Sequence, residues 1–249
     1  MNDIFWKLIE EGVVAVYMDD ILIFTKTLEE HRKVVAQVLQ ILKENHLYLK
    51  PDKCIFEVQR VEFLGLILSE NQVEMDPIKI EGVRNWPSPR KVKEVQSFLG
   101  FVNFYRRFIA DFSRIAHPLH DLTWKDTVWE WRVKHEKAFC ELKDQTTSTP
   151  ILVQPDVSRP FKLETDASDF ATGAVLSQLC MDEKWRPVGF LSKSLNDAEC
   201  NYPIHDKELL SVIRALKEWR HLLEGATHAI EIYNDHRNLT FFMEAQNLN

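Results

Sequence analysis

Five carboxylates stand where they could bind divalent cations. Asp19 and Asp20 are adjacent and lie between two apolar runs, VVAVYM and ILIFT. Asp166 falls at the end of a predicted strand, Glu208 in the first turns of a predicted helix, and Asp235 at the end of another predicted strand. Carboxylate oxygens suit Mg²⁺, and two such ions about 4 Å apart can activate water and stabilise the leaving oxygen of a phosphodiester. These residues raise the hypothesis of metal-dependent phosphodiester chemistry.

Each of these acids also has an ordinary structural explanation. Asp19-Asp20 suits the turn of a hairpin, although two adjacent carboxylates repel each other unless a cation or hydrogen-bond donors lie nearby. Asp166 suits a turn, Glu208 the first turn of a helix, where the dipole favours an acid, and Asp235 a cap. Spacing alone does not make the last three converge, so both explanations stay open.

The N-terminal part predicts small elements around the first acidic pair. VVAVYM and ILIFT are β-branched and aromatic runs, which predict a tight hairpin with Asp19-Asp20 at its turn. Thr27 and Glu30 form a capping box before an apolar stripe at helical spacing, which predicts a helix over 28–46. Three further runs have the composition of strands: LYLK, CIFEV and VEFLGLILS.

The pattern becomes helical at Asp76-Pro77, a pair typical of an N-cap and a first helical position. Helices are predicted over 77–86, 90–99 (ended by Gly100), 102–111 and 133–146. Three prolines between 150 and 160 indicate a boundary. Beyond it, FKLETDAS, TGAVLSQLC, RPVGFLSKS and HAIEIYND predict strands, and PIHDKELLSVIRALKEWRHLLEG predicts one long amphipathic helix.

Composition narrows the class of protein. The 249 residues carry a net charge of −7, which counts against a dedicated nucleic-acid-binding protein, but residues 76–118 hold eight Lys and Arg against four Asp and Glu. No apolar run approaches the length of a membrane span, and the N-terminus lacks the features of a signal peptide. Four widely spaced cysteines without a CxxC pair indicate reduced thiols in an intracellular protein.

Several stretches, in the same order, resemble one known family. Tyr17-Met18-Asp19-Asp20 resembles the YxDD motif of reverse transcriptases. ILIFTKTLEEH, LKPDKCIFEVQRVEFLGLILS and NWPSPRKVKEVQSFLGFVNFYRRFI resemble the second half of a gypsy-type LTR-retrotransposon polymerase. LETDASDFATGAVLSQ, NYPIHDKELLSVIRALKEWRHLLEG and NDHRNL resemble the RNase H domain that follows it. The resemblance runs through essentially the whole chain and identifies it as a fragment of a retrotransposon pol polyprotein.

The resemblance implies an α+β and α/β architecture in four segments. They are a partial polymerase palm with its hairpin (1–75), a helical thumb (76–117), a connection (118–159), and an RNase H-like mixed-sheet domain that is incomplete at its C-terminus (160–249). The implied chemistry is RNA-directed DNA polymerisation and metal-dependent hydrolysis of RNA in RNA–DNA hybrids. The alternative is a catalytically inactive relic of a retroelement or a nucleic-acid-binding protein.

The resemblance also assigns roles to residues. The implied catalytic residues and metal ligands are Asp19, Asp20, Asp166, Glu208 and Asp235, with two Mg²⁺ or Mn²⁺ ions in the RNase H domain. Phe63-Leu64-Gly65 matches the hairpin that grips the primer. The implied nucleic-acid-binding residues of the thumb are Lys79, Arg90, Lys91, Lys93, Arg106 and Arg107. Three aromatic residues among them, Phe101, Phe104 and Tyr105, are interpreted as core packing in preference to base stacking.

The implied partners are an RNA–DNA hybrid and a template–primer. Only 18 residues precede Asp19, so the family's fingers and a third palm aspartate are expected outside this chain. Deoxynucleotide binding is therefore expected only if those parts are supplied, and polymerisation is not expected from the chain alone. A fourth acidic RNase H ligand is not assigned; Glu244 is the only acid after Asp235. The expected location is the cytoplasm or nucleus, with a virus-like particle implied by the family, and the oligomeric state is left open.

Overall fold

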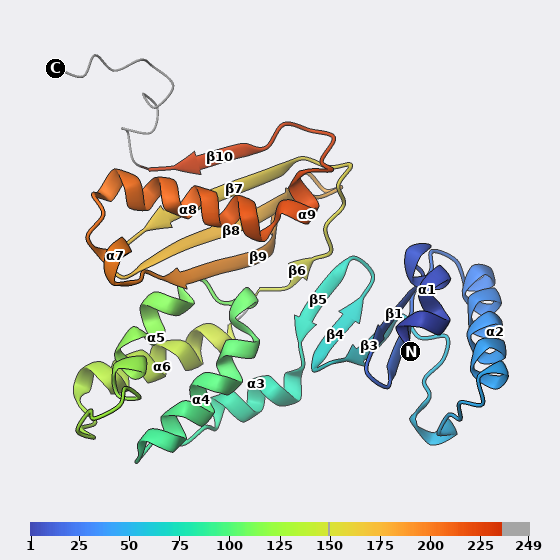
Figure 1. The fold of residues 1–249 in the computed structure, drawn as a ribbon, viewed down its shortest axis with the longest axis horizontal. Helices are drawn as coiled ribbons and strands as arrows, with labels where there is room; N and C mark the ends of the chain where they lie inside the picture. The colour runs from blue at the N-terminus through green and yellow to red at the C-terminus, as the bar shows by residue number, and fades with distance from the viewer. Residues whose placement is uncertain (149, 236–249) are drawn as a thin grey trace. The chain divides into compact units, whose positions relative to one another are not determined.

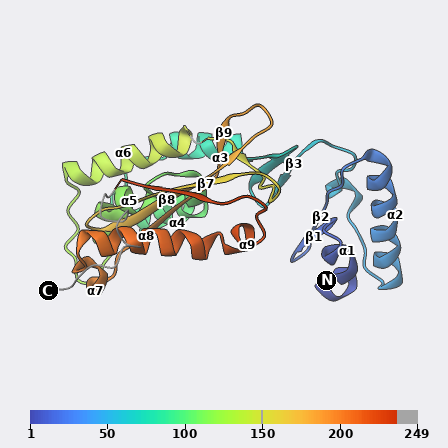
Figure 2. The same ribbon diagram turned by 90° about the horizontal axis from the view of Figure 1, so that it is seen from above.

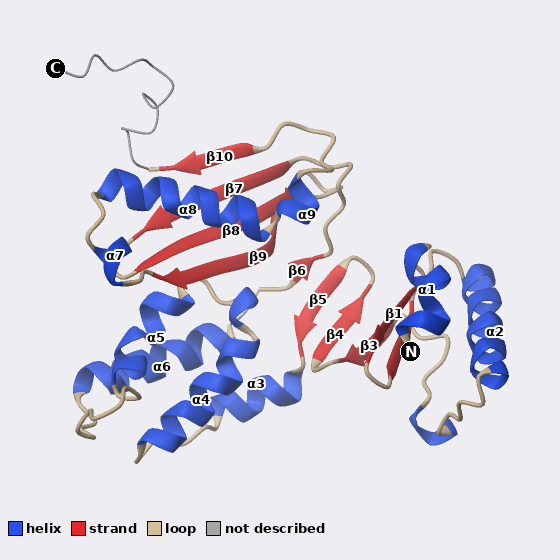
Figure 3. Cartoon of the chain, in the orientation of Figure 1, coloured by secondary structure: helices blue, strands red, loops and turns tan. Residues whose placement is uncertain are grey.

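The structure, a computed structural model, describes residues 1–148 and 150–235 (Figure 1). Glu244 lies outside the described residues. The chain forms two compact units, Met1–Phe63 and Leu64–Asn249. Both mix helices with strands (Figure 3), which confirms the predicted mixed α and β class. Within the described ranges, no helix combines the length and the apolar character needed to cross a bilayer. The four-segment division of the chain stays a prediction.

The first unit packs two helices on a hairpin. Its elements are α1 (Asn2–Glu10), β1 (Val14–Tyr17), β2 (Asp20–Ile23), α2 (Leu28–Glu44), a 3₁₀ turn η1 (Pro51–Lys53) and β3 (Arg60–Phe63). Thr27 caps α2, since its hydroxyl accepts a hydrogen bond from the N–H of Glu30 at 3.2 Å. The core consists of Phe5, Leu8, Val14, Val34, Val38 and Leu42. The two strands of the predicted hairpin are therefore confirmed, and so is the helix predicted over 28–46.

Two predicted strands in this unit are wrong. LYLK and CIFEV form no strand, and Pro51 between them begins the 3₁₀ turn η1. Tyr48 is 92% exposed and Ile55 is also exposed. A strand is stable only when it pairs with a neighbour and buries one face, and these segments do neither. Their β-branched and aromatic composition was therefore a misleading signal.

The second unit begins with a small sheet and a helical layer. The sheet strands are β4 (Leu66–Ser69), β5 (Gln72–Met75) and β6 (Leu152–Val153), of which β5 pairs antiparallel with both others. The helical elements are α3 (Pro77–Arg84), α4 (Val92–Phe104), the 3₁₀ turn η2 (Arg106–Phe108), α5 (Phe112–Asp121) and α6 (Val133–Thr147). They share one core, in which the rings of Phe98 on α4 and Phe139 on α6 lie 4.6 Å apart.

The predicted helix boundaries at 99–102 and 111 are wrong. Helix α4 continues through Gly100 to Phe104, because Phe98, Leu99 and Val102 are all buried and outweigh the weak helix propensity of one glycine. Tyr105 is the C-cap of α4, and η2 begins at the next residue, Arg106. Helix α5 then starts after Asp111, whose backbone is left-handed with φ of 52°. The predicted N-cap at Asp76 is confirmed, since its carboxylate accepts from the N–H of Ile78 at 2.9 Å.

The predicted strand VEFLGLILS is divided by a turn at Leu64 and Gly65. Both residues are left-handed, with φ of 53° and 75°. The hydroxyl of Tyr105 donates to the carbonyl of Gly65 at 3.1 Å, so α4 braces this turn. The turn is the segment that the resemblance assigns to primer binding.

Gly65→Ala is expected to lower the free energy of unfolding by about 1–2 kcal/mol. Alanine is strained at φ of 75°, and its Cβ would lie 3.2 Å from the hydroxyl oxygen of Tyr105. Gly100→Ala is the matched control: no atom lies within 4 Å of its added Cβ, and it should stabilise α4 by roughly 0.5–1 kcal/mol. Urea unfolding measures both. Equal effects of the two variants would contradict the strained turn.

The rest of the second unit is a four-stranded sheet with a long helix on one face (Figure 2). Its elements are β7 (Phe161–Ala167), β8 (Ala171–Leu179), β9 (Trp185–Ser194), α7 (Asp197–Cys200), α8 (Ile204–Glu218), α9 (Arg220–Leu223) and β10 (Glu231–Asn234). The order is β10-β7-β8-β9, with β10 parallel to β7 and the other pairs antiparallel. The predicted long helix is interrupted at Trp219, whose buried ring joins the core.

Candidate metal centre

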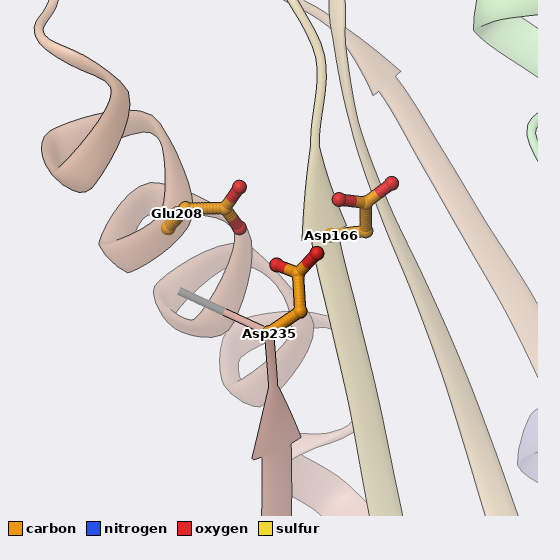
Figure 4. Close-up of side chains that lie close together, drawn as sticks. All are labelled: Asp166, Glu208 and Asp235. Atoms are coloured by element: carbon orange, nitrogen blue, oxygen red, sulfur yellow. The ribbon is translucent and has the colours of Figure 1, made fainter. Parts of the chain in front are cut away.

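Asp166, Glu208 and Asp235 converge at one end of the β7–β10 sheet (Figure 4). One carboxylate oxygen from each lies within 4.8 Å of the others. The topology explains two of them: β10 runs parallel to β7, with Asn234 beside Thr165, so the next residue along each strand is an aspartate. The carboxyl ends of neighbouring parallel strands meet at one edge of a sheet, where side chains can share a ligand.

Glu208 is fixed from the helical side. It lies in the first turns of α8, is 3% exposed, and points toward β7 in Figure 4. Its carboxylate accepts a hydrogen bond from the side-chain amide of Asn234 at 2.8 Å. The same amide donates to the carbonyl and the hydroxyl of Thr165, at 3.2 and 3.1 Å. Asn234 therefore ties the two strands and the helix together beside the acidic group.

A part-buried ion pair holds α8 against the sheet. The Arg214 guanidinium donates to both oxygens of Glu199 on α7, at 2.8 and 2.7 Å, and to the hydroxyl of Thr172 on β8 at 3.0 Å. The side chains of Arg214 and Glu199 are only 11% and 15% exposed. Asn196 caps α7 by accepting from the N–H of Glu199 at 2.9 Å. This network fixes the helix that carries Glu208.

The three carboxylates destabilise one another when no cation is present. Burial is the main cause that raises the pKa of Glu208, and the charges of Asp166 and Asp235 raise it further, while the Asn234 hydrogen bond opposes the shift. Burial also raises the pKa of Asp166, with repulsion from Asp235 and Asp111 added. A divalent cation removes that repulsion and uses carboxylate oxygens as hard ligands. The donor set therefore fits Mg²⁺ or Mn²⁺.

In protein without divalent ions, Glu208→Gln is expected to raise the free energy of unfolding at pH 7 by on the order of 1 kcal/mol, because the neutral amide removes a buried, repelled charge. The raised pKa means that ionised Glu208 opposes folding. The wild-type protein therefore sheds this penalty as pH falls through the raised pKa toward the ordinary value of about 4.3. The advantage of the variant should shrink on acidification. Urea unfolding at neutral and acidic pH measures it.

Asp206→Asn is the control for this prediction, since Asp206 is an exposed acid in the same helical turn. Mg²⁺ should stabilise the wild-type protein more than Glu208→Gln, because ligand binding to the folded state alone raises its stability. If Glu208→Gln is less stable than the wild type at pH 7 without divalent ions, the three carboxylates do not destabilise the folded protein as described.

Within the described residues, Asp19 and Asp20 do not belong to a cluster of three or more potential metal ligands. The turn of their hairpin centres on Met18 and Asp19, with Met18 left-handed at φ of 52°, and Asp20 already pairs with Tyr17 as the first residue of β2. The prediction that Asp19-Asp20 forms the turn is therefore wrong by one residue, because the β-ladder extends as far as Asp20. Both carboxylates are exposed.

The predicted nucleic-acid-binding residues have different environments. Arg90, Lys91 and Lys93 are exposed around the start of α4, Lys79 is half-buried on α3, and Arg107 is exposed in η2. Arg106 is also in η2, but its guanidinium donates to the carbonyl of Ser192 on β9 and to the hydroxyl of Ser113. Its observed contacts are therefore internal to the protein.

The prediction that three aromatic residues pack in the core is confirmed for two of them. Tyr105 is buried and Phe101 packs against the helical core. Phe104 is 57% exposed and meets Tyr105 edge-on, so core packing is wrong for it. Phe104 has the helical spacing of a core residue, but it is the last residue of α4, where the chain leaves the core.

The structure also brings two residues to the acidic group that the sequence did not connect with it. Asp111 and Arg114, at the start of α5, line a shallow depression together with Asp166, Ser168 and Thr172. Arg114 is one of the eight basic residues between 76 and 118. More than fifty positions separate these residues from Asp166, and no local pattern predicts a contact over that separation.

Comparisons with known proteins agree along most of the chain. Residues 131–232 match the family described as "RNase H-like domain found in reverse transcriptase", and residues 1–68 match "Reverse transcriptase (RNA-dependent DNA polymerase)". The Transposon Tf2-3 polyprotein of Schizosaccharomyces pombe is 43% identical over 230 residues, which are 92% of this chain and 17% of that protein. The Tf2-7 polyprotein is 42% identical over 231 residues. The chain thus spans about a sixth of the length of these relatives.

Solved structures give the same result for the fold. The foamy viral protease–reverse transcriptase in complex with an RNA/DNA hybrid superposes with a TM-score of 0.77 and 25% identity, covering 98% of this chain and 34% of that one. The same viral protein in complex with double-stranded DNA gives a TM-score of 0.78 and 25% identity, covering 98% of this chain and 50% of that one.

Proposed function

Because this chain belongs to the reverse transcriptase and RNase H family of Ty3/gypsy-type retrotransposon polyproteins, we propose that it hydrolyses RNA within RNA–DNA hybrids at Asp166, Glu208 and Asp235. The observation that carries the proposal is the convergence of these three carboxylates, from three separate elements, to within 4.8 Å. Single-residue explanations as a turn, a helix acid and a cap do not require the three to meet.

The three residues would hold two Mg²⁺ or Mn²⁺ ions. When bound, such ions activate water and stabilise the oxygen that leaves the phosphodiester. Asp166 and Asp235 are exposed and offer their oxygens on the side open to a substrate, whereas Glu208 is buried and restrained by Asn234. The protein therefore supplies one restrained ligand, Glu208, and two ligands that a substrate can reach, Asp166 and Asp235.

An RNA–DNA hybrid is the proposed substrate. The similar foamy viral protein is described in complex with an RNA/DNA hybrid, which supports this assignment. A hybrid is recognised by its A-like shape and by the 2′-hydroxyls of one strand, so sequence specificity is not required. Arg90, Lys91 and Lys93, exposed at the start of α4, would meet backbone phosphates and make binding sensitive to salt.

The first unit is proposed to act in RNA-directed DNA polymerisation. Residues 1–68 match the reverse transcriptase family, and Asp19 and Asp20 are exposed at the tip of an antiparallel hairpin, which supports a role as metal ligands. Phe63, Leu64 and Gly65 would contact the primer, at the turn that Tyr105 braces. Further acidic ligands and the deoxynucleotide-binding surface would come from other parts of the polyprotein.

The working location is proposed to be the cytoplasm or nucleus. All four cysteines, Cys54, Cys140, Cys180 and Cys200, are free thiols. Free thiols persist where the compartment is reducing, which supports an intracellular protein.

Cleavage of a labelled hybrid tests the proposed nuclease. The purified full chain is incubated with Mg²⁺ and an RNA–DNA hybrid labelled on the RNA strand, beside double-stranded DNA and double-stranded RNA of the same sequence. We expect cleavage of the RNA strand in the hybrid alone, and its loss when EDTA removes the metal. Binding of the hybrid without cleavage would overturn the nuclease and favour a nucleic-acid-binding protein.

A further inference from the structure

The start of helix α5 is attached to the sheet that carries Asp166. The N–H of Ser113 donates to the hydroxyl of Ser192 on β9 at 2.8 Å, and the Arg106 guanidinium donates to the carbonyl of Ser192. Ser113 and Ser192 are both buried. Hydrogen bonds between buried groups fix the register of two packed elements, so the first turn of α5 has a defined place over β8 and β9.

Gly173 lets Asp111 approach the acidic group. Gly173 lies directly opposite Asp166 in the β7–β8 ladder. A Cβ atom at Gly173 would lie 3.2 Å from a carboxylate oxygen of Asp111, so a larger residue would press on the Asp111 side chain. Directly opposed residues on antiparallel strands have Cβ positions about 5 Å apart. Asp111 therefore stands beside Asp166, although the two belong to different layers.

Asp111 in turn orients Arg114. One oxygen of Asp111 accepts from Nη2 of Arg114 at 3.1 Å and from Nε at 3.3 Å, and Glu141 lies 3.9 Å from the same Nη2. The Arg114 side chain is 49% exposed. Among the described residues, Nη1 of Arg114 has no hydrogen-bond partner, so part of its five-donor fork faces solvent at the edge of the depression that contains Asp166.

We infer that Arg114 is a phosphate-contacting residue of the nuclease site, held beside Asp166 by Asp111 and binding a backbone phosphate of the RNA strand. The inference rests on the proposed nuclease function. A hybrid that enters this site brings phosphates toward five carboxylates, which repel them: those of Asp111, Glu141, Asp166, Glu208 and Asp235. A guanidinium matches a phosphate with paired hydrogen bonds as well as charge, so Arg114 offsets the repulsion where the strand must approach most closely.

The contact is tested by the affinity and salt dependence of hybrid binding. In an Asp166→Asn background, which prevents turnover, fluorescence anisotropy measures Kd for a labelled hybrid across a salt series. Arg114→Ala should raise Kd by about tenfold, and the slope of log affinity against log salt should fall by about 0.9, the value for one phosphate contact. Arg114→Lys should keep the slope but recover only part of the affinity, because an ammonium lacks the paired geometry.

Arg220→Ala is the matched control. Arg220 lies on α9, away from α5, and is an exposed arginine that pairs with Glu224. It should leave Kd and the salt slope unchanged. Melting temperatures of all variants should agree with that of the parent, because exposed ion pairs contribute little stability. In a protein with Asp166 intact, Arg114→Ala should raise KM and leave kcat within about twofold, as expected when uniform binding is lost.

The outcomes separate the contact from the nuclease. If the wild-type protein cleaves the hybrid but Arg114→Ala matches Arg220→Ala in Kd and slope, the contact is overturned and the nuclease stands. If the wild-type protein does not cleave the hybrid, the nuclease is overturned. A higher Kd for Arg114→Ala than for Arg220→Ala would then show only that Arg114 binds nucleic acid. A fall in kcat without a change in KM would also overturn the assignment to binding.

Discussion

Asp166→Asn is expected to lower the rate of RNA cleavage in a hybrid by about a thousandfold or more, which equals roughly 4 kcal/mol of transition-state stabilisation. Asparagine has nearly the same shape as aspartate, but it removes one charge and one strong oxygen ligand from the three that converge. The fold should survive, because Asp166 is exposed and its charge is already disfavoured by partial desolvation and by repulsion from Asp235. Single-turnover cleavage with Mg²⁺ measures the loss.

The control for this prediction is Asp206→Asn, which removes an exposed acid from the turn of α8 that carries Glu208. It should cleave at the wild-type rate. Glu208→Gln should fail as Asp166→Asn does, despite its greater stability without metal. Equal cleavage by the wild type and Asp166→Asn would show that the nuclease centre lies elsewhere, whatever the geometry of the three acids.

Arg214→Ala is expected to lower the free energy of unfolding by about 2–3 kcal/mol, less than the roughly 3–5 kcal/mol of a fully buried pair, because it leaves the part-buried Glu199 carboxylate without its partner. The same change releases α8 from Thr172 on β8, so the position of Glu208 and the cleavage rate should suffer as well. Arg186→Ala is the control: its pair with Asp182 is more than 40% exposed, and its loss should cost less than about 1 kcal/mol. Urea unfolding at pH 7 compares the two variants.

The pH dependence of this ion pair gives a second measurement. The pKa of Glu199 is lowered, first by the backbone N–H of Asn196 and then by Arg214. A lowered pKa contributes stability above the ordinary value of about 4.3, and this contribution is lost as pH falls through the lowered value. Arg214→Ala should therefore flatten the acid limb of the stability curve. An unchanged stability curve at acidic pH, or a loss of stability similar to that of Arg186→Ala, would contradict a stabilising role for the Arg214–Glu199 pair.

The strands and helices of the second unit were largely predictable because each buries one regular face. Along β7, Phe161 and Leu163 are buried in alternation, and α8 buries Glu208, Ser211 and Ala215 at helical spacing. LYLK and CIFEV carry strand-like residues but find no partner, and pairing is a non-local property that composition does not encode. Gly100 failed as a helix end because its buried neighbours favour continuation.

The site was predictable in its members but not in its geometry. Residue type and the resemblance identified Asp166, Glu208 and Asp235, whereas their convergence depends on the parallel register of β10 beside β7 and on the anchoring of α8 by Arg214. Asp111 and Arg114 were beyond reach, since they meet Asp166 through the packing of α5 on β8 and β9. Strongly local signals thus identified the ligands, and tertiary contacts determined what surrounds them.

Asp166, Glu208 and Asp235 are proposed to form one divalent-metal centre. Anomalous scattering from Mn²⁺ in crystals of the full chain tests this centre most directly. The prediction is one or two strong peaks bounded by Asp166, Glu208 and Asp235 in the wild-type protein, and their loss or marked weakening in Asp166→Asn. No peak at saturating Mn²⁺, or peaks only at other carboxylates and unchanged in the variant, would contradict the claim.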